Sequence, residues 1–180
     1  MKGVLIASMG AFALIATAPF INHLPGSVVA QSIKNQPQLQ LRLGAEKQII
    51  SKDQQGKQKV TWQALQGQAV VQPGDVLRYT LNGENKSDRS IKNLTLNQPI
   101  PKGTVYVLKS VDISQKEAKI TYSIDGGRSF VENPTVKVTL PGGKVEIKPA
   151  PATAYTNIRL QLPLVAAKTT VKATYLTQVR

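Results

Sequence analysis

The side chains that most often carry catalysis are scarce in this chain of 180 residues. It contains no Cys and a single His, His23, which lies in the apolar N-terminal region. The missing thiols exclude disulfides, thiolate metal sites and cysteine nucleophiles. A serine nucleophile that is activated by histidine needs an imidazole, and His23 is the only one that this sequence supplies.

The ten carboxylates offer the remaining route to acid–base chemistry or metal binding. Glycoside hydrolysis needs two positioned carboxyl groups, whereas these acids are scattered, and Asp75 and Asp125 fall in turn sequences. The spacing of a calcium-binding loop does not occur, nor does a glycine-rich phosphate loop. We therefore expect a protein that is not an enzyme, with no catalytic residue, cofactor or metal site. A small carboxylate-dependent hydrolase and a calcium site between loops are the less favoured alternatives.

The excess of positive charge is the feature of the sequence that says most about a possible ligand. The chain has 23 Lys and Arg against 10 Asp and Glu, which gives a formal net charge of +13. No two basic residues are adjacent, but Lys52, Lys57 and Lys59 gather around one turn sequence. These three lysines are our candidates for contact with an anionic ligand. The alternative is a solvated surface that keeps the protein soluble.

The first thirty residues have the pattern of a secretory signal. Lys2 precedes an uncharged, almost wholly apolar run over residues 4–18. That run is shorter than the roughly 20 residues of a membrane-spanning helix and suits a signal core. We predict a signal peptide over residues 1–30, cleaved after Ala30, and a flexible linker over residues 31–38. An uncleaved leader is the alternative, and it would then provide the chain's contact with a membrane.

Cleavage and export have two consequences. Removal of residues 1–30 takes away His23 and one basic residue, which leaves 22 basic residues against 10 acids and no imidazole. Export would place the protein in the periplasm, on the cell surface or outside the cell.

Period-two alternation of apolar and polar residues recurs along the rest of the chain, and each alternation predicts a strand with one buried and one solvated face. Sequences rich in Pro, Gly and Asp separate these segments and suit tight turns. Short strands at this spacing predict an all-β fold, an immunoglobulin-like β-sandwich over residues 39–180, with a closed barrel as the alternative. The nine alternating segments are 39–43, 60–64, 77–81, 94–96, 120–124, 136–140, 145–147, 158–162 and 171–175.

The first of these segments continues to Ile50, which is long for one strand. Gly44 and Ala45 predict a bulge or a bend within it. We expect its second half to pair with residues 60–65 as a hairpin that lies outside the central sandwich.

Residues 123–130, Ser-Ile-Asp-Gly-Gly-Arg-Ser-Phe, form a distinctive turn sequence. The segment resembles the Asp-box hairpin that repeats in sialidase-type propellers, but a propeller needs several copies and this chain has one. We expect a structural hairpin in which Asp125 accepts turn amides, Gly126 and Gly127 adopt positive φ, and Phe130 packs beneath them.

A second resemblance is carried by residues 73–107. A Pro-Gly-Asp turn at 73–75 enters a strand that contains Tyr79, Asn85 follows that strand, and a Pro-Lys-Gly bend at 101–103 closes the next hairpin. This pattern resembles the conserved repeat domain of bacterial surface proteins that is number eleven in its series of domains of unknown function. Here it occurs in a single copy, with Asn97 near the place where that family usually has Asp.

The resemblance implies an exported bacterial β-sandwich of the immunoglobulin-like type, with a family-like core over residues 68–180. It implies a structural or interaction module of the cell surface and no catalytic residues. Fold alone does not fix function, so the functional implication is an expectation by analogy.

Together these observations predict an exported, non-enzymatic β-sandwich that acts as a structural or interaction module of the cell envelope or the extracellular space. The expected partners are an envelope or extracellular protein, or an anionic polysaccharide. A basic binder of anionic glycan or extracellular nucleic acid is the alternative. Sequence-specific reading of nucleic acid is not expected, because no recognition helix is predicted. Exposed sheet edges would also allow self-association.

Overall fold

The computed structural model describes residues 4–5, 39–67 and 69–180. The expected cleavage point after Ala30, the linker over 31–38 and most of the leader lie outside these residues. The nine longer strands are β2 (Leu39–Lys52), β3 (Gln58–Ala64), β5 (Val76–Asn85), β6 (Ile91–Pro99), β9 (Lys119–Ser123), β10 (Thr135–Thr139), β11 (Val145–Pro149), β12 (Asn157–Val165) and β13 (Thr170–Val179). The shorter elements are β1 (Val4–Leu5), β4 (Val70–Val71), β7 (Thr104–Tyr106), β8 (Asp112–Ile113) and the 3-10 helix η1 (Ala152–Ala154).

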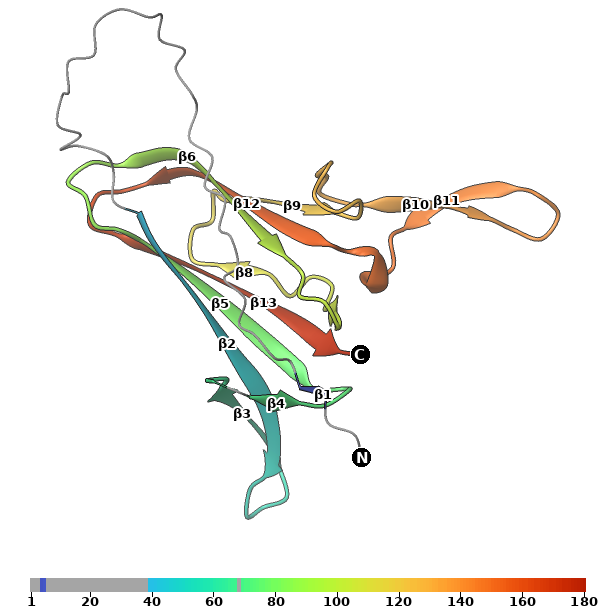
Figure 1. The fold of residues 1–180 in the computed structure, drawn as a ribbon, viewed down its shortest axis with the longest axis horizontal. Coiled ribbons are helices and arrows are strands. Elements are labelled where there is room, and N and C mark those ends of the chain that lie inside the picture. The colour runs from blue at the N-terminus through green and yellow to red at the C-terminus, as the bar shows by residue number, and fades with distance from the viewer. Residues whose placement is uncertain (1–3, 6–38, 68) are drawn as a thin grey trace, which may run out of the picture.

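The protein is an all-β sandwich, as the alternation predicted. One sheet has the order β3-β2-β5-β13-β7, with β8 also paired to β13, and the other has the order β6-β12-β9. All of these pairings are antiparallel. Figure 1 shows the two layers, with β6, β12 and β9 above β2, β5 and β13. In the part of the chain that is described, no helix is long and apolar enough to cross a membrane.

The core lies between β5 and β13 on one side and β6 and β12 on the other. Every second residue of β5 is buried, and β13 and β12 alternate in the same way over most of their length. Tyr79 and Tyr175 face each other across the β5–β13 pair and stack, with 5.1 Å between their ring centroids. Leu160 of β12 and Leu96 of β6 belong to the same apolar cluster from the opposite layer. The alternation therefore assigns the buried faces of the central strands correctly.

A second aromatic group closes one end of the sandwich. The rings of Tyr106, Tyr122 and Tyr155 lie 5.4–5.5 Å from one another, and the Tyr106 hydroxyl donates to that of Tyr122 at 3.3 Å. Burial raises the pKa of Tyr122 far above its ordinary value. All three rings pack together, and Tyr122 and Tyr155, whose pKa values are both raised by burial, stay neutral at physiological pH.

The turn at residues 123–130 has the predicted hydrogen bonds and glycine conformations, and its half-buried Phe130 ring lies against the Arg159 guanidinium, 3.5 Å from the ring centroid. The Asp125 carboxylate accepts the backbone amides of Arg128 and Ser129 and the hydroxyl of Ser123. Hydrogen bonds from Ser129, with its hydroxyl first among them, hold the pKa of Asp125 well below its usual range. Gly126 and Gly127 adopt φ of 77° and 87°, as expected. Because this carboxylate is committed to the turn, it is not available as an acid or a base.

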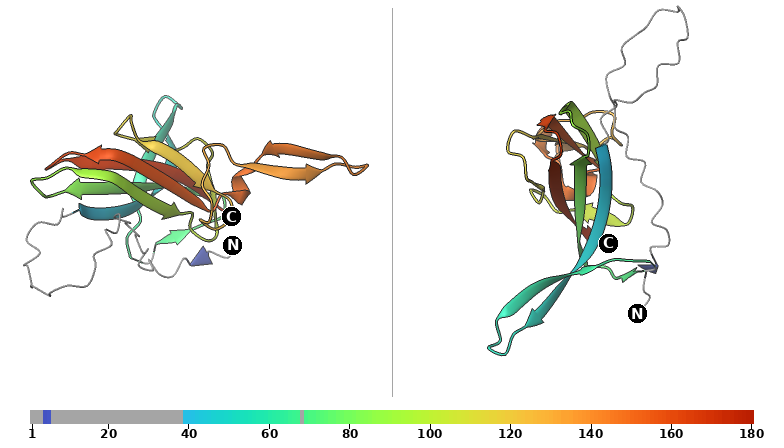
Figure 2. Two further views of the ribbon diagram at one scale, coloured as in Figure 1. Left: turned by 90° about the horizontal axis from the view of Figure 1, so that it is seen from above. Right: turned by 90° about the vertical axis from the view of Figure 1, so that its left-hand side faces the viewer.

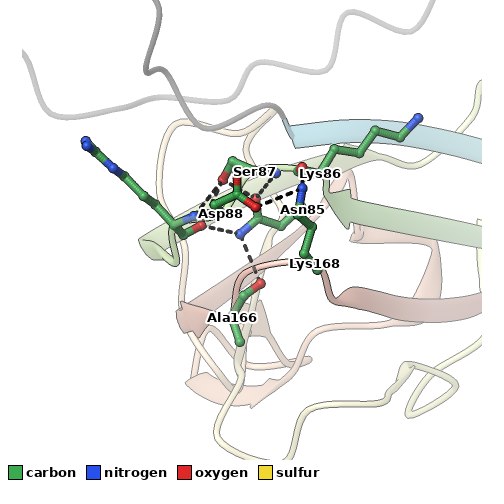
Figure 3. A network of polar contacts seen from close by, with 7 residues as sticks. Asn85, Lys86, Ser87, Asp88, Ala166 and Lys168 are labelled. Atoms are coloured by element: carbon green, nitrogen blue, oxygen red, sulfur yellow. Dashed lines mark hydrogen bonds and ion pairs between the residues drawn. The ribbon is translucent and has the colours of Figure 1, made fainter.

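Asn85 joins two loops at the end of β5. Its side chain is fully buried, and its Nδ2 donates to the carbonyls of Arg89, Val165 and Ala166 at 2.8–3.2 Å. Its Oδ1 accepts from both the backbone amide and the hydroxyl of Ser87. Figure 3 shows this network at the point where the β5–β6 and β12–β13 loops meet. One amide side chain thus satisfies five polar groups and ties the two sheets together.

Two of the alternating hairpins depart from the predicted burial. β10 and β11 pair only with each other among the described strands and extend away from the sandwich (Figures 1 and 2). Ile147 is 70% exposed and Val145 is 55% exposed, so the expectation that each alternation buries one face is wrong here. It is wrong also for β3, where Val60 is 50% exposed. Alternation orders the two faces of a strand, but burial requires a second layer opposite.

The predicted hairpin outside the central sandwich is confirmed. The second half of β2 leaves the β5 partner and pairs with β3 from Glu46↔Ala64 to Lys52↔Gln58. No bulge occurs at Gly44, because the pairing of β2 with β5 runs without an extra residue from Leu39↔Asn85 to Lys47↔Leu77.

Replacement of Asn85 tests whether its side chain holds the β5–β6 and β12–β13 loops together, an arrangement that we call the Asn85 clamp. We expect Asn85→Ala to lower the free energy of unfolding by about 2 kcal/mol, because buried carbonyls lose their donor. Urea denaturation followed by circular dichroism measures the change. The matched control is Asn133→Ala, since Asn133 is exposed and its side chain has no hydrogen bond to any described residue, and it should change stability by less than about 0.5 kcal/mol. Equal effects of the two substitutions would contradict the clamp.

Candidate anionic-ligand site

The structure brings the three predicted lysines together at the tip of the β2–β3 hairpin. Lys52 is the last residue of β2, Lys57 lies in the turn, and Lys59 is the second residue of β3. All three are exposed. The hairpin reaches past the end of the sandwich, at the bottom of Figure 1, so the tip projects into solvent. We call these three residues the lysine tip.

The turn that carries the lysine tip is held by Asp53. Its Oδ1 accepts the amides of Gln55 and Lys57, both at 2.9 Å. The Asp53 amide donates to the Lys57 carbonyl, and the Gly56 amide donates to the Asp53 carbonyl. Gly56 adopts φ of 78°, a conformation that favours glycine. The one carboxylate at the tip is therefore engaged with turn amides, and the lysine positions are fixed by a hydrogen-bonded turn.

The base of the hairpin is anchored by a stack of three side chains. The Arg78 guanidinium of β5 lies over the Trp62 ring of β3, 4.2 Å from its centroid. The same guanidinium donates through Nε and Nη2 to Glu46 Oε2 at 2.8 and 2.7 Å. A two-point contact of this kind fixes the guanidinium plane, so β3 is held against the sheet where the hairpin begins.

The acids nearest to the hairpin base are already neutralised. Lys47 Nζ lies 2.7 Å from Asp75 Oδ2, which also accepts the Gln72 amide. Burial raises the pKa of Asp75, but the hydrogen bonds from Lys47 and Gln72 outweigh it and the pKa is lowered. Among the described residues, no carboxylate lies within ion-pair distance of Lys52, Lys57 or Lys59. The lysine tip thus keeps an excess of positive charge, with three unpaired ammonium groups against the single carboxylate of Asp53, while the charge of the base is balanced.

The lysines flank the tip on both faces. Lys52 pairs with Gln58 across the hairpin, so the neighbouring Lys59 points to the opposite face. Beside Lys52, on its face, lies the exposed cross-strand pair of Ile50 and Val60. The lysines do not converge on one point, so the tip suits an extended polyanion or a charged surface rather than a small discrete anion.

The other titratable groups do not assemble into a site. Six of the ten carboxylates form ion pairs with Lys or Arg, and Asp53 and Asp125 accept turn amides. In residues 39–67 and 69–180, no group of three or more acidic or histidine side chains could hold a metal ion. A small gap between the sheets is lined by apolar side chains such as Leu81, Leu94 and Leu160.

Sequence reasoning missed the Arg78 stack and the Asn85 clamp. The signal for the stack was present, since Trp62 lies on a predicted strand that leaves the sandwich. The register was not predicted: it pairs Arg78 with Glu46 and Trp62 with Gln48, so that the guanidinium reaches the ring across β2. Trp62 and Tyr155, the aromatic residues of interest for ligand contact, are half-buried and covered by Arg78 and by other tyrosines.

Comparison of the chain with family models, with curated proteins and with solved structures yields no match. The resemblance to bacterial surface-protein repeats therefore stays a hypothesis that rests on the motifs in residues 73–107.

The contact between Arg78 and Trp62 can be tested by fluorescence, because Trp62 is the only Trp in the chain. We expect Arg78→Ala to uncover the indole and raise its quenching by acrylamide. Loss of the cation–π contact and of the ion pair should also lower stability by about 1 kcal/mol. The control is Arg89→Ala, because the exposed Arg89 side chain takes part in no ion pair or stack among the described residues. Unchanged quenching in Arg78→Ala would show that the guanidinium does not cover Trp62.

Proposed function

We propose that this protein is an exported β-sandwich that acts by binding rather than by catalysis, and that the lysine tip is a contact site for an anionic polysaccharide. Export follows from the leader pattern at residues 1–30 and would place the protein in the periplasm, on the surface or outside the cell. The resemblance to bacterial surface-protein repeats supports the same role for the sandwich.

The observation that carries this proposal is that most carboxylates of the protein form ion pairs, whereas the lysines of the tip do not among the described residues. Six of the ten carboxylates form ion pairs with a Lys or Arg, whereas none of the three tip lysines does so in the described part of the chain. The only carboxylate in their turn is that of Asp53, which accepts turn amides, so three ammonium groups face one carboxylate. An excess of positive charge on a projecting turn attracts polyanions. A basic group close to an anionic surface contributes roughly 1 kcal/mol, and salt screens the attraction.

A glycan fits the tip better than single-stranded nucleic acid. Proteins that bind single strands combine basic grooves with aromatic side chains on which bases stack. The tip carries no aromatic residue between Ser51 and Thr61, and the one nearby indole, Trp62, is covered by Arg78. Sulfate and carboxylate groups on a polysaccharide need only charge and hydrogen-bond donors, which three lysines supply.

Heparin serves as the probe for this proposal. We expect the protein to bind heparin at low salt and the affinity to fall steeply as salt is raised. The triple variant Lys52→Gln, Lys57→Gln, Lys59→Gln should lose roughly tenfold to a hundredfold in affinity. Surface plasmon resonance on immobilised heparin measures both effects, and competition with single-stranded DNA separates glycan from nucleic acid binding.

A matched variant removes the same charge elsewhere. Lys92, Lys102 and Lys116 are exposed, form no ion pair among the described residues, and lie away from the hairpin tip. Their triple replacement by Gln should reduce heparin affinity much less than loss of the lysine tip. Equal losses in the two variants would show that heparin responds to net charge alone, and binding that salt does not weaken would overturn the proposal.

A further inference from the structure

The β10–β11 hairpin is the part of the fold least explained by the sandwich. It pairs with no other strand of the described chain, and it projects from the molecule as a separate arm (Figures 1 and 2). An isolated two-stranded hairpin is only marginally stable in water. An arm of this kind with apolar side chains uncovered is a surface that a partner can complete.

The backbone of β10 presents a free hydrogen-bonding edge. The Leu140 amide donates to the Lys144 carbonyl, and the Ala150 amide donates to the Pro134 carbonyl. In an antiparallel ladder such bonded pairs alternate with pairs whose polar groups point outward. The amides and carbonyls of Thr135, Lys137 and Thr139 therefore face away from β11, and none of them bonds to another strand within the described residues.

The outer edge of β11 is less suited to pairing. Its outward positions are Val145, Ile147 and Pro149, which lie opposite the outward residues of β10. Pro149 has no amide hydrogen and interrupts a ladder on that side. The open edge of β10, with three free amides, is thus the edge that can accept another strand.

The two faces of the hairpin differ. On one face Glu146 lies between Lys144 and Lys148, at 3.3 and 3.6 Å, and this polar row stands across from the half-buried Val136 and Val138. The opposite face leaves Val145 and Ile147 exposed, with Ile147 directly across from Lys137. Only this second face offers uncovered apolar surface, and it borders the open edge of β10.

The charge of Lys137 selects the partner. Lys137 is exposed at the centre of the open edge, and no carboxylate pairs with it in the described chain. A twofold pairing of β10 with β10 of a second copy, centred on this residue, would place Lys137 opposite Lys137, and like charges directly opposite destabilise a sheet. An acidic residue at that position would attract it.

We propose that the β10 edge binds an extended segment of another protein by strand addition, with an Asp or Glu opposite Lys137 and β-branched residues around it. Backbone hydrogen bonds supply affinity in this mode, and alternate side chains supply selectivity. The proposal rests on the protein acting by contact, but it uses a surface separate from the lysine tip, so peptide binding and heparin binding can fail independently.

The probe is a heptapeptide labelled at its N-terminus, fluorescein-Thr-Val-Thr-Glu-Thr-Val-Thr-amide, compared with the same peptide carrying Lys at its centre. We expect fluorescence anisotropy of the full chain to show binding of the Glu peptide about three- to tenfold tighter than the Lys peptide. Lys137→Glu should reverse this preference, and it changes only an exposed side chain. A Glu peptide with N-methyl groups on the amides that face β10 should not bind, because those amides can no longer donate to the β10 carbonyls.

Three outcomes would overturn the proposal. One is no binding of the Glu peptide up to about 1 mM, the weak end of specific affinity. Another is equal binding of the N-methylated peptide, which would mean that no strand is added. The third is a concentration-dependent dimer in sedimentation that Ile147→Ser removes, which would assign this edge to a second copy of the chain.

Discussion

Burial of alternate side chains between two sheets is the interaction on which the rest of the structure depends. Leu77 and Leu81 of β5 and Ile158 and Leu162 of β12 are each at most 2% exposed, and they meet in one apolar cluster. Each fully buried side chain of this size contributes roughly 1.5–3 kcal/mol. With no Cys in the chain to form a disulfide, this cluster and the Asn85 network hold the layers together, and the hairpins extend from that scaffold.

The sequence predicts the strands far better than it predicts what covers them. Each of the nine alternating segments lies on a strand to within one residue, because a period of two shows which side chains share a face. Whether a second sheet covers that face depends on the topology of the fold. The alternation therefore predicts that Val60 and Ile147 are buried, whereas both are exposed in the structure. The two- and three-residue strands β4, β7 and β8 are too short to show a period. Asn85 was noted only as a motif residue, since a polar residue at a strand end does not reveal the carbonyls that it will meet.

The position of the candidate site could be predicted from the sequence, but its charge balance could not. Clustering of Lys52, Lys57 and Lys59 around a turn follows from their spacing in the sequence. Their lack of ion pairs within the described residues does not, because it depends on which lysines the fold brings to the acids, as it brings Lys47 to Asp75. Of the two projecting hairpins, β2–β3 carries the lysine tip and β10–β11 carries the open strand edge. In this account a rigid sandwich presents two chemically different contact surfaces, one for anionic polymer and one for an acidic strand.

Amide hydrogen exchange, read residue by residue by NMR, tests this account most directly. If the core between the sheets holds the fold and the hairpins stand outside it, amides of β5, β12 and β13 should exchange only through global unfolding, while those of β10, β11 and the outer part of β3 exchange through local opening, many times faster. Protection of β10 and β11 equal to that of β13 in the isolated protein would contradict it, since it would mean that the hairpin is already covered.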